Sequence, residues 1–173
     1  MVRLREAQPA WLCTMVEFRE IHDANRHWVT AIHPGKEARF WVHFNEYWLE
    51  RASSRVGIQT RLVSAGSDIV GFIAFGQFYE DDALTRARSG WYELIHLVID
   101  QRFQGRGFGR SATVKALQLI ELEPDCGVLA VAHHPDNHRA RSLYRSLGFH
   151  ETDLRNYDND PILLRAPRAA PDG

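Results

Sequence analysis

Cysteine is scarce in this sequence, which excludes a fold held together by a framework of disulfides. Cys13 and Cys126 are its two cysteines among 173 residues, far fewer than a small disulfide-stapled secreted domain carries. We expect both thiols to be reduced, as in a protein of the cytoplasm. The length fits one domain and is sufficient to bury a sizeable core.

Long apolar runs and an excess of positive charge are also missing. No run approaches the roughly 20 apolar residues that span a bilayer, and the first residues lack the basic and apolar regions of a signal peptide. Lys and Arg number 21 against 22 Asp and Glu, which indicates no basic surface for nucleic acid. We therefore expect a cytoplasmic protein that has neither a membrane nor a nucleic acid as its partner.

Two familiar phosphate-binding motifs are absent, although residues 104–110 read Gln-Gly-Arg-Gly-Phe-Gly-Arg. A Walker loop requires Gly-x-x-x-x-Gly-Lys-Ser/Thr, and the dinucleotide fingerprint requires Gly-x-Gly-x-x-Gly. Glycines at positions 105, 107 and 109 fit neither pattern. The commonest nucleotide-binding loops are thus excluded, and a simple tight turn is the alternative to a phosphate site of another kind.

The surroundings of this glycine-rich stretch place it between a strand and a helix. Trp91–Ile99 is nearly continuous in apolar residues, as in a central strand, and residues 111–123 have a helical pattern. Glycine permits positive φ angles and close approach to a ligand. The first N–H groups of a helix lack intrahelical partners and carry the positive end of its dipole. We therefore predict that residues 104–110 bind a pyrophosphate, with Arg106 and Arg110 adding charge.

The rest of the chain predicts an α/β fold with a largely antiparallel sheet, in one domain over residues 1–165. A disordered tail is expected over residues 166–173 because the segment is rich in proline and small residues. Apolar residues on helix 37–52 form one broad aromatic face, which is either core or part of an acceptor pocket. The expected strands are 2–7, 60–64, 69–78, 91–99, 128–132, 150–154 and 161–165, and the expected helices are 9–18, 37–52, 111–123 and 137–147.

Two segments together resemble a known family. Gln104, Gly107 and Gly109 form Gln-x-x-Gly-x-Gly, and residues 137–149 read Asn-His-Arg-Ala-Arg-Ser-Leu-Tyr-Arg-Ser-Leu-Gly-Phe. In this order and spacing they resemble the acetyl-CoA-binding motif and the Asn-x-x-Ala-x-x-Leu-Tyr-x-x-x-Gly-Phe segment of the GNAT family of N-acetyltransferases. The close match covers residues 91–152. The resemblance implies a GNAT fold, with a mixed, mostly antiparallel sheet, a splayed central strand pair and helices on both faces.

The resemblance also implies acetyl-CoA as the cosubstrate. In the family, the strand before the glycine loop bulges and splays from the next strand, and the pantetheine arm lies in the opening. The Leu97 N–H is expected to polarise the thioester oxygen, and Asn137 either reaches the arm or caps its own helix. The expected contacts are Leu97, Val98, Ile99, Gln104, Gly105, Arg106, Gly107, Phe108, Gly109, Arg110, Asn137 and Tyr144.

Three residues are the candidates for catalysis. The resemblance makes Tyr144 the general acid, since a phenol with a pKa near 10 stays protonated beside a departing thiol; a core-facing aromatic is the alternative. Glu93 is a carboxylate inside an apolar strand, which is costly without a partner or a task. It is the candidate base, and His96 competes with it. No metal is expected, because the adjacent His133 and His134 would point to opposite faces of a strand.

The acceptor is predicted only as an amine, with a small cation or polyamine favoured. In the family, the second helix and the connection near residues 79–90 border the acceptor site, and acids there would attract a cation. The alternative for these acids is a solvated surface. Two alternatives stay open for the function: acetylation of a peptide amine or an amine antibiotic, and a non-catalytic protein that senses acetyl-CoA. A homodimer also stays open. The acids concerned are Glu46, Glu50, Glu80, Asp81 and Asp82.

Overall fold

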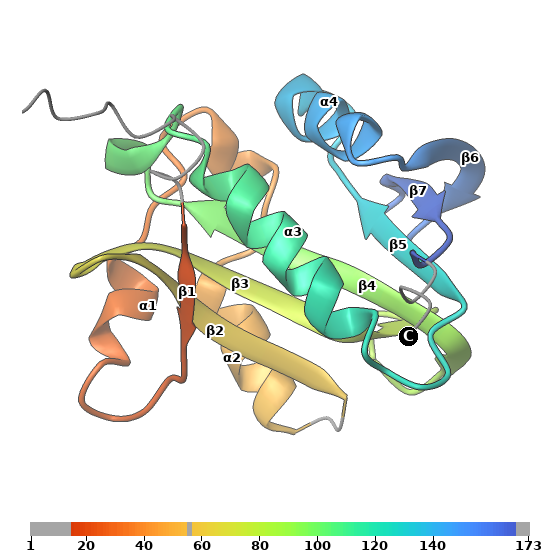
Figure 1. Ribbon diagram of the computed structural model, residues 1–173, viewed down its shortest axis with the longest axis horizontal. Coiled ribbons are helices and arrows are strands. Elements are labelled where there is room, and N and C mark those ends of the chain that lie inside the picture. Colours follow the sequence, from red (N-terminus) through yellow and green to blue (C-terminus); the bar gives the residue numbers. More distant parts are fainter. Residues whose placement is uncertain (1–14, 55–56, 169–173) are drawn as a thin grey trace, which may run out of the picture.

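A sheet with strand order β1-β2-β3-β4-β5-β7-β6 forms the centre of the computed structural model, which describes residues 15–54 and 57–168 (Figure 1). Within that range β4 and β5 are parallel, and every other neighbouring pair is antiparallel. The strands are β1 (Glu17–Arg19), β2 (Ile58–Ala65), β3 (Asp68–Tyr79), β4 (Ala87–Ile99), β5 (Val128–Ala132), β6 (His150–Arg155) and β7 (Pro161–Arg165).

Helices cover both faces of this sheet, as expected (Figure 1). The helix α3 (Phe108–Ile120) crosses one face and buries Ala112, Ala116 and Ile120 against Ile73 and Leu94. Helices α1 (His27–Ala31) and α2 (Asn45–Ser53) lie on the other face, where α2 packs against β2 and β3. The helix α4 (His138–Ser146) joins the α3 side, and short 3-10 turns η2 (Ala38–Phe40) and η3 (Gln101–Phe103) complete the described elements.

The hairpin, the central strand and the elements after it form where the sequence predicts them. The β2–β3 hairpin turns at residues 66–67, β5 and β7 have the expected bounds, and α3 and α4 begin within three residues of the expected positions. The central strand begins earlier than expected, at Ala87, and the connection before it is correspondingly shorter. Within residues 22–36, which have no regular pattern, the short helix α1 forms.

Two helix predictions near the N-terminus are wrong in part. Residues 17–19 form strand β1 instead of continuing a helix, because Glu17–Arg19 pair with Leu62–Ser64 of β2. The predicted helix 37–52 is broken between η2 and α2. Phe44 has an extended backbone, with φ −63° and ψ 147°. Asn45 starts α2 by donating hydrogen bonds to the carbonyls of Val29 and Ile32, so tertiary contacts override local propensity.

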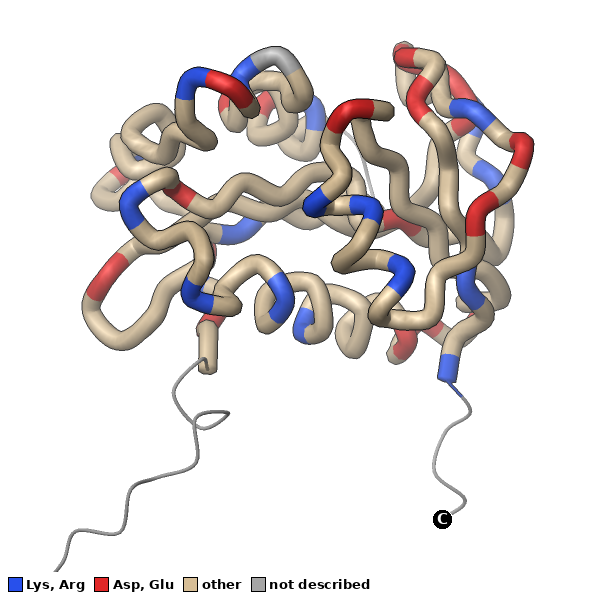
Figure 2. Tube along the Cα trace, turned by 90° about the horizontal axis from the view of Figure 1, so that it is seen from above, with Lys and Arg blue, Asp and Glu red and all other residues tan. Residues whose placement is uncertain are grey.

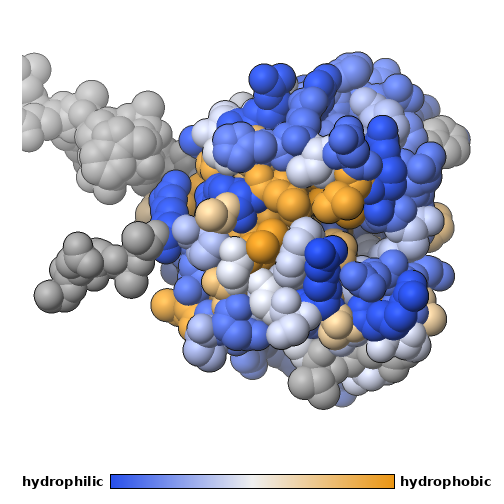
Figure 3. Space-filling model, turned by 90° about the vertical axis from the view of Figure 1, so that its right-hand side faces the viewer, coloured by the Kyte–Doolittle hydropathy of each residue, from blue (hydrophilic) through white to orange (hydrophobic). Residues whose placement is uncertain are grey.

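Some expectations lie outside the described residues. These are the strand at residues 2–7, most of the helix at residues 9–18, Cys13, and the end of the tail at residues 169–173. No helix within the described ranges is long and apolar enough to span a membrane. Positive and negative residues are mixed along the trace (Figure 2), and one side shows a central apolar patch with a hydrophilic border (Figure 3).

Candidate active site

The site begins where strands β4 and β5 separate. Their parallel pairing runs from Trp91 opposite Val128 to Leu94 opposite Val131, and beyond it β4 is paired only with β3 in the described sheet. A bulge lies at the same point, because Ala74 faces His96 whereas Phe75 faces Leu94. Ile95 is the extra residue. This is the splayed, bulged strand pair that the family resemblance implies.

The bulge changes which side chains face the α1–α2 side of the sheet. Strict alternation would send Ile95 and His96 to opposite faces. In the structure Ile95 packs against the α1–α2 core, and the His96 ring also lies there, 5.7 Å from the ring of Phe72. The bulge thus turns His96 away from the α3 side.

A cavity of about 1090 Å³ extends from this opening to both sides of it. At one end, which we call the loop end, it is lined by Pro34–Ala38, Leu97–Ile99, Gln101, Phe103–Gly105, Gly107–Arg110, Asp136–Ala140, Leu143 and Tyr144. At the other end, which we call the acceptor end, it is lined by Trp41–His43, Trp48, Glu93, Ile95, His96, Ala132–His134, Asn156–Asp158 and Asp160. One space therefore joins the glycine loop to the last hairpin.

The glycine loop presents main-chain donors to the loop end. Gly105 and Gly107 have φ angles of 77° and 83°, in the left-handed region that glycine adopts without strain. Gly107 is the N-cap of α3, and the first N–H bonded inside this helix is that of Ser111, which donates to the Gly107 carbonyl. The N–H groups of the first turn therefore face the cavity without an intrahelical partner. The conformation suits an anion such as a pyrophosphate.

The side chains of this loop brace it. The Gln104 amide donates to the carbonyls of Ile99 (2.9 Å) and Pro34 (3.0 Å), which ties the end of β4 to the segment before η2. Arg110 donates to the Ser146 hydroxyl at 2.7 Å and so joins α3 to α4. Arg106 lies over the ring of Phe103 and is not among the residues that line the cavity. Arg106 is therefore the predicted loop contact that the structure does not bring to the cavity.

Asn137 caps α4, which confirms one of its two predicted roles. Its side-chain oxygen accepts a hydrogen bond from the Ala140 N–H at 3.1 Å. The residue also lines the cavity. Because the cap uses only the oxygen, the amide N–H groups stay available to a ligand in the loop end.

Glu93 is a carboxylate without a partner. It lies on β4 just before the strands separate, and it makes no hydrogen bond or ion pair with any residue that the structure describes. Burial raises the pKa of its carboxyl group to about 8. The cost of ionising this group would fall if a cation entered the cavity beside it.

His96 is held as a neutral core residue. Its Nε2 lies 2.9 Å from the Asn45 side-chain oxygen, and the Asn45 amide nitrogen already donates to two carbonyls. His96 Nε2 therefore carries the hydrogen and donates it to Asn45. Burial, with a smaller contribution from His43, lowers the pKa of His96 to about 3. A histidine with that pKa stays neutral throughout the physiological range.

Tyr144 approaches the opening from the opposite side of the sheet. Its side chain is 8% exposed and belongs to the α3-side core, with its ring 6.1 Å from that of Phe149. Burial, and then the charge of Glu93, raises the pKa of the phenol to about 12. Tyr144 and Glu93 thus meet at one cavity from two faces, and burial raises the pKa of both groups.

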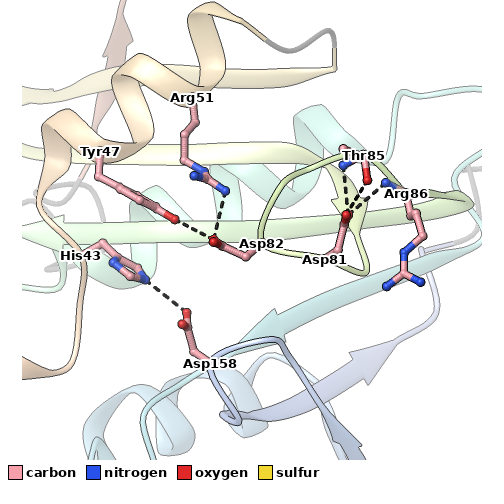
Figure 4. Close-up of polar contacts among 8 residues, drawn as sticks. All are labelled: His43, Tyr47, Arg51, Asp81, Asp82, Thr85, Arg86 and Asp158. Atoms are coloured by element: carbon pink, nitrogen blue, oxygen red, sulfur yellow. Dashed lines mark hydrogen bonds and ion pairs between the residues drawn. The ribbon is translucent and has the colours of Figure 1, made fainter.

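The acceptor end contains His43, Tyr157, Asp158 and Asp160, which sequence reasoning missed, and Trp41, which belongs to the aromatic face that was considered for an acceptor pocket. Tyr157, Asp158 and Asp160 come from the turn between β6 and β7, and Trp41 and His43 come from the break before α2. The His43 ring nitrogen Nε2 lies 3.1 Å from a carboxylate oxygen of Asp158, so these two segments touch (Figure 4). The available sequence signal was the polar and aromatic composition of residues 156–160, which does not reveal their tertiary neighbours.

The acids predicted to border the acceptor site do not line the cavity. Asp82 instead accepts hydrogen bonds from the Tyr47 hydroxyl (2.8 Å) and from Arg51 (3.0 Å), and Asp81 accepts from Thr85 and Arg86 in its own turn (Figure 4). Glu46, Glu50, Glu80, Asp81 and Asp82 are all absent from the cavity lining.

The adjacent histidines end strand β5 as expected. His133 Nδ1 lies 2.8 Å from the His134 carbonyl oxygen, and the ring of His134 stacks on Trp41 at 6.2 Å. Among residues 15–54 and 57–168, no three His, Cys, Asp or Glu side chains are grouped so that they could hold a metal ion.

Comparison with known proteins identifies the family. The model of the "Acetyltransferase (GNAT) family" matches residues 16–149. The spermine/spermidine N(1)-acetyltransferase of Bacillus subtilis is 21% identical over 150 residues, which is 87% of this chain and 97% of that protein. The chain therefore belongs to the GNAT family and is an acetyl-CoA-dependent N-acetyltransferase.

Solved structures agree on the fold. The Salmonella typhimurium protein yncA, solved with its cofactor acetyl-CoA, aligns with a TM-score of 0.64 at 17% identity, covering 91% of this chain and 98% of that one. The aminoglycoside acetyltransferase AAC(6')-Ib, solved with coenzyme A, aligns with a TM-score of 0.70 at 14% identity, covering 87% and 94%. The residues at the loop end fit such a cosubstrate, because they offer unpaired helix N–H groups beside a strand edge.

Proposed function

We propose that this protein transfers the acetyl group of acetyl-CoA to a primary amine of a small cationic acceptor, by direct attack in a ternary complex. One observation carries the proposal. Glu93 and Tyr144 reach one cavity from opposite faces of the sheet, at the point where β4 and β5 separate. A thioester placed in that opening has a carboxylate on the amine side and a phenol on the sulfur side.

The loop end holds the cosubstrate in this proposal. The first-turn N–H groups of α3 bind the pyrophosphate. The edge of β4 that β5 leaves open over Leu97–Ile99 provides main-chain groups for the pantetheine arm. The Leu97 N–H polarises the thioester oxygen and stabilises the negative charge that develops on it. The free amide of Asn137 adds a donor to the arm.

Glu93 accepts the proton of the incoming ammonium, directly or through one water. The neutral amine attacks the thioester carbon and the C–N bond forms. As the tetrahedral intermediate collapses, the C–S bond breaks and the nitrogen releases its second proton to solvent, which leaves a neutral amide. Tyr144 donates its phenolic proton to the departing thiolate. Between a base pKa of about 8 and an acid pKa of about 12, both groups are in the protonation state that the reaction needs.

His96 is not the base in this proposal. Its Nε2 hydrogen is committed to Asn45, and its low pKa makes it a weak proton acceptor. We assign it a structural role, which is to hold the bulge of β4 against α2.

The proposal is tested by thiol release from acetyl-CoA in the presence of single amines, with the product identified by mass spectrometry. The panel contains spermidine, putrescine, an aminoglycoside, a peptide with a free N-terminus and a lysine peptide. We expect the polyamines to be acetylated. Turnover with peptides alone would contradict the small-cation acceptor. Binding of acetyl-CoA without any turnover above hydrolysis would indicate a sensor instead of an enzyme with this acceptor class.

A further inference from the structure

The two ends of the cavity differ in their charged side chains, although the described lining of the loop end also includes Glu37 and Asp136, and that of the acceptor end also includes His43, His96, His133 and His134. The Lys and Arg side chains in the described lining of the cavity are Lys36, Arg110 and Arg139, and all three lie at the loop end. The acceptor end has no Lys or Arg in its described lining, although it has three carboxylates, those of Glu93, Asp158 and Asp160. A phosphate-bearing cosubstrate matches the first end, and a cation matches the second.

Asp160 is the carboxylate of the β6–β7 turn that is free to bind a ligand. The neighbouring Asp158 is already in contact with His43. The Asp160 side chain has no hydrogen-bond or ion-pair partner among residues 15–54 and 57–168, although it lies in the cavity lining and is only partly exposed. Its backbone is fixed, because the Asp160 N–H donates to the Asn156 side chain (2.8 Å) and the Asn156 N–H donates to the Asp160 carbonyl (3.0 Å).

Aromatic rings line the same end. Tyr157, from the same turn as Asp160, packs against the α1–α2 core and also borders the cavity. Burial, and then the charge of Glu93, raises the pKa of its phenol, so the ring is neutral at every physiological pH. Trp41 borders the cavity from the opposite segment and stacks on His134. The faces of such rings attract cations, most strongly where water is excluded.

We infer that Asp160, together with the Tyr157 ring of the same turn, binds a second cationic group of the acceptor while Glu93 receives the amine that reacts. The acceptor is then a diamine or polyamine, and an amine with a single charge is a poor substrate. This inference rests on the proposed function, because it assigns the acceptor end of the same site. The His43–Asp158 contact positions the turn that carries both residues.

The test compares two acceptors that differ in one charge, putrescine and butylamine, by the ratio of their kcat/KM values. We expect the wild-type protein to prefer putrescine strongly. The substitution Asp160→Asn should reduce this preference by roughly 10- to 100-fold, as when one charged hydrogen-bonding partner is lost. The matched control is Asp153→Asn, because Asp153 is exposed on β6 and outside the cavity lining. The control Asp153→Asn should keep the wild-type ratio of kcat/KM values. Both variants should keep the wild-type melting temperature.

Three outcomes would overturn the inference. The wild-type protein could fail to discriminate between the two amines, Asp160→Asn could lower kcat/KM equally for both, or Asp153→Asn could change the ratio as much. Calorimetric binding of putrescine and butylamine to the protein saturated with CoA separates this failure from failure of the proposed function. If no amine is acetylated, the proposed function fails. The inference is still supported if putrescine binds more tightly than butylamine and if this difference depends on Asp160. Equal binding of putrescine and butylamine overturns the inference that Asp160 binds a second cationic group.

Discussion

In the proposed function, the loop end and the acceptor end of one cavity recognise their ligands by different means. The loop end offers main-chain N–H groups at the start of α3 and along β4, and its side chains, such as Gln104 and Arg110, brace the protein itself. The acceptor end offers side chains from four separate segments. Main-chain donors persist through most substitutions, whereas side chains change with each one. We therefore expect the proposed cosubstrate site to tolerate more side-chain substitutions than the proposed acceptor site.

Tyr144 lies at the junction of the two ends, and its loss should have the largest effect. Tyr144→Phe keeps the buried ring and removes the proton that the thiolate needs. We expect kcat to fall roughly 10²- to 10⁴-fold, the usual contribution of a positioned acid. The Kd for acetyl-CoA, measured by calorimetry, should change little because the proton is used only as the bond breaks. Full kcat in this variant would remove tyrosine from the mechanism.

Glu93→Gln tests the acceptor side of the same junction. The variant can use only amine that is already neutral, so we expect kcat/KM to fall roughly 10²-fold at neutral pH. Because Glu93 ionises near pH 8, the loss should be constant below that pH and should shrink above it. A pH profile of kcat/KM for both proteins checks this. A variant that keeps the wild-type profile would exclude Glu93 as the base.

Gly107→Asp should break the loop end alone. A negative side chain on a residue with φ 83° both strains the N-cap and repels a phosphate. We expect the Kd for CoA to rise roughly 10- to 100-fold. Gly66→Asp is the matched control, since Gly66 has φ 60° and open space around it in the β2–β3 turn. Equal weakening of CoA binding by both variants would refute the loop as the pyrophosphate site.

The same Glu93→Gln substitution should stabilise the protein without ligands. The folded pKa of Glu93 lies above its ordinary value of 4.5, so the folded state binds the extra proton and loses stability as pH rises from about 4.5 to about 8. The variant should gain roughly 1–3 kcal/mol at pH 8, the cost of a buried group without a partner. At pH 4 the two proteins should unfold alike. Denaturant unfolding at both pH values measures the difference.

The acids outside the cavity should have the smallest effect. Glu80 and Asp82 pair with Arg88, Arg51 and Tyr47, and they do not border the acceptor end. The double variant Glu80→Gln/Asp82→Asn should leave KM for spermidine within about twofold, as expected for exposed ion pairs. If the double variant raised KM strongly, and raised it less at high salt, these acids would contribute to binding of the acceptor.

The loop end could be predicted from the sequence because its determinants are local. Glycines at 105, 107 and 109 follow a long apolar strand and precede a helical pattern, and the fold places them at the cavity. The Asn137 cap and the bounds of β5 and β7 follow from equally local patterns. What the glycine spacing could not show is that Arg106 turns onto Phe103 and leaves the site.

Glu93, His96 and the aromatic face of residues 37–52 were predicted from the sequence, but the rest of the acceptor end could not be, because its residues meet only through tertiary contacts. Trp41 and His43 lie in a break that the aromatic pattern of residues 37–52 concealed, since Asn45 ties the start of α2 to α1. Tyr157 and Asp160 come from a turn more than a hundred residues later. Among the acids that looked promising by position, Asp82 instead accepts hydrogen bonds from Tyr47 and Arg51 of α2. The choice between Glu93 and His96 likewise depended on the bulge in β4.

The separation of β4 and β5 has a consequence for solubility. A strand whose neighbour departs presents an open edge, and open edges invite pairing with other protein chains and lead to aggregation. Here the edge of residues 95–99 borders an internal cavity instead of the outer rim of the sheet, with α3 and α4 on one side and the segment before α2 on the other. A slender ligand can lie along this edge, whereas a second polypeptide strand with its own side chains is kept out. The protein can therefore keep an open strand edge in its centre without the aggregation that such an edge would cause on the surface.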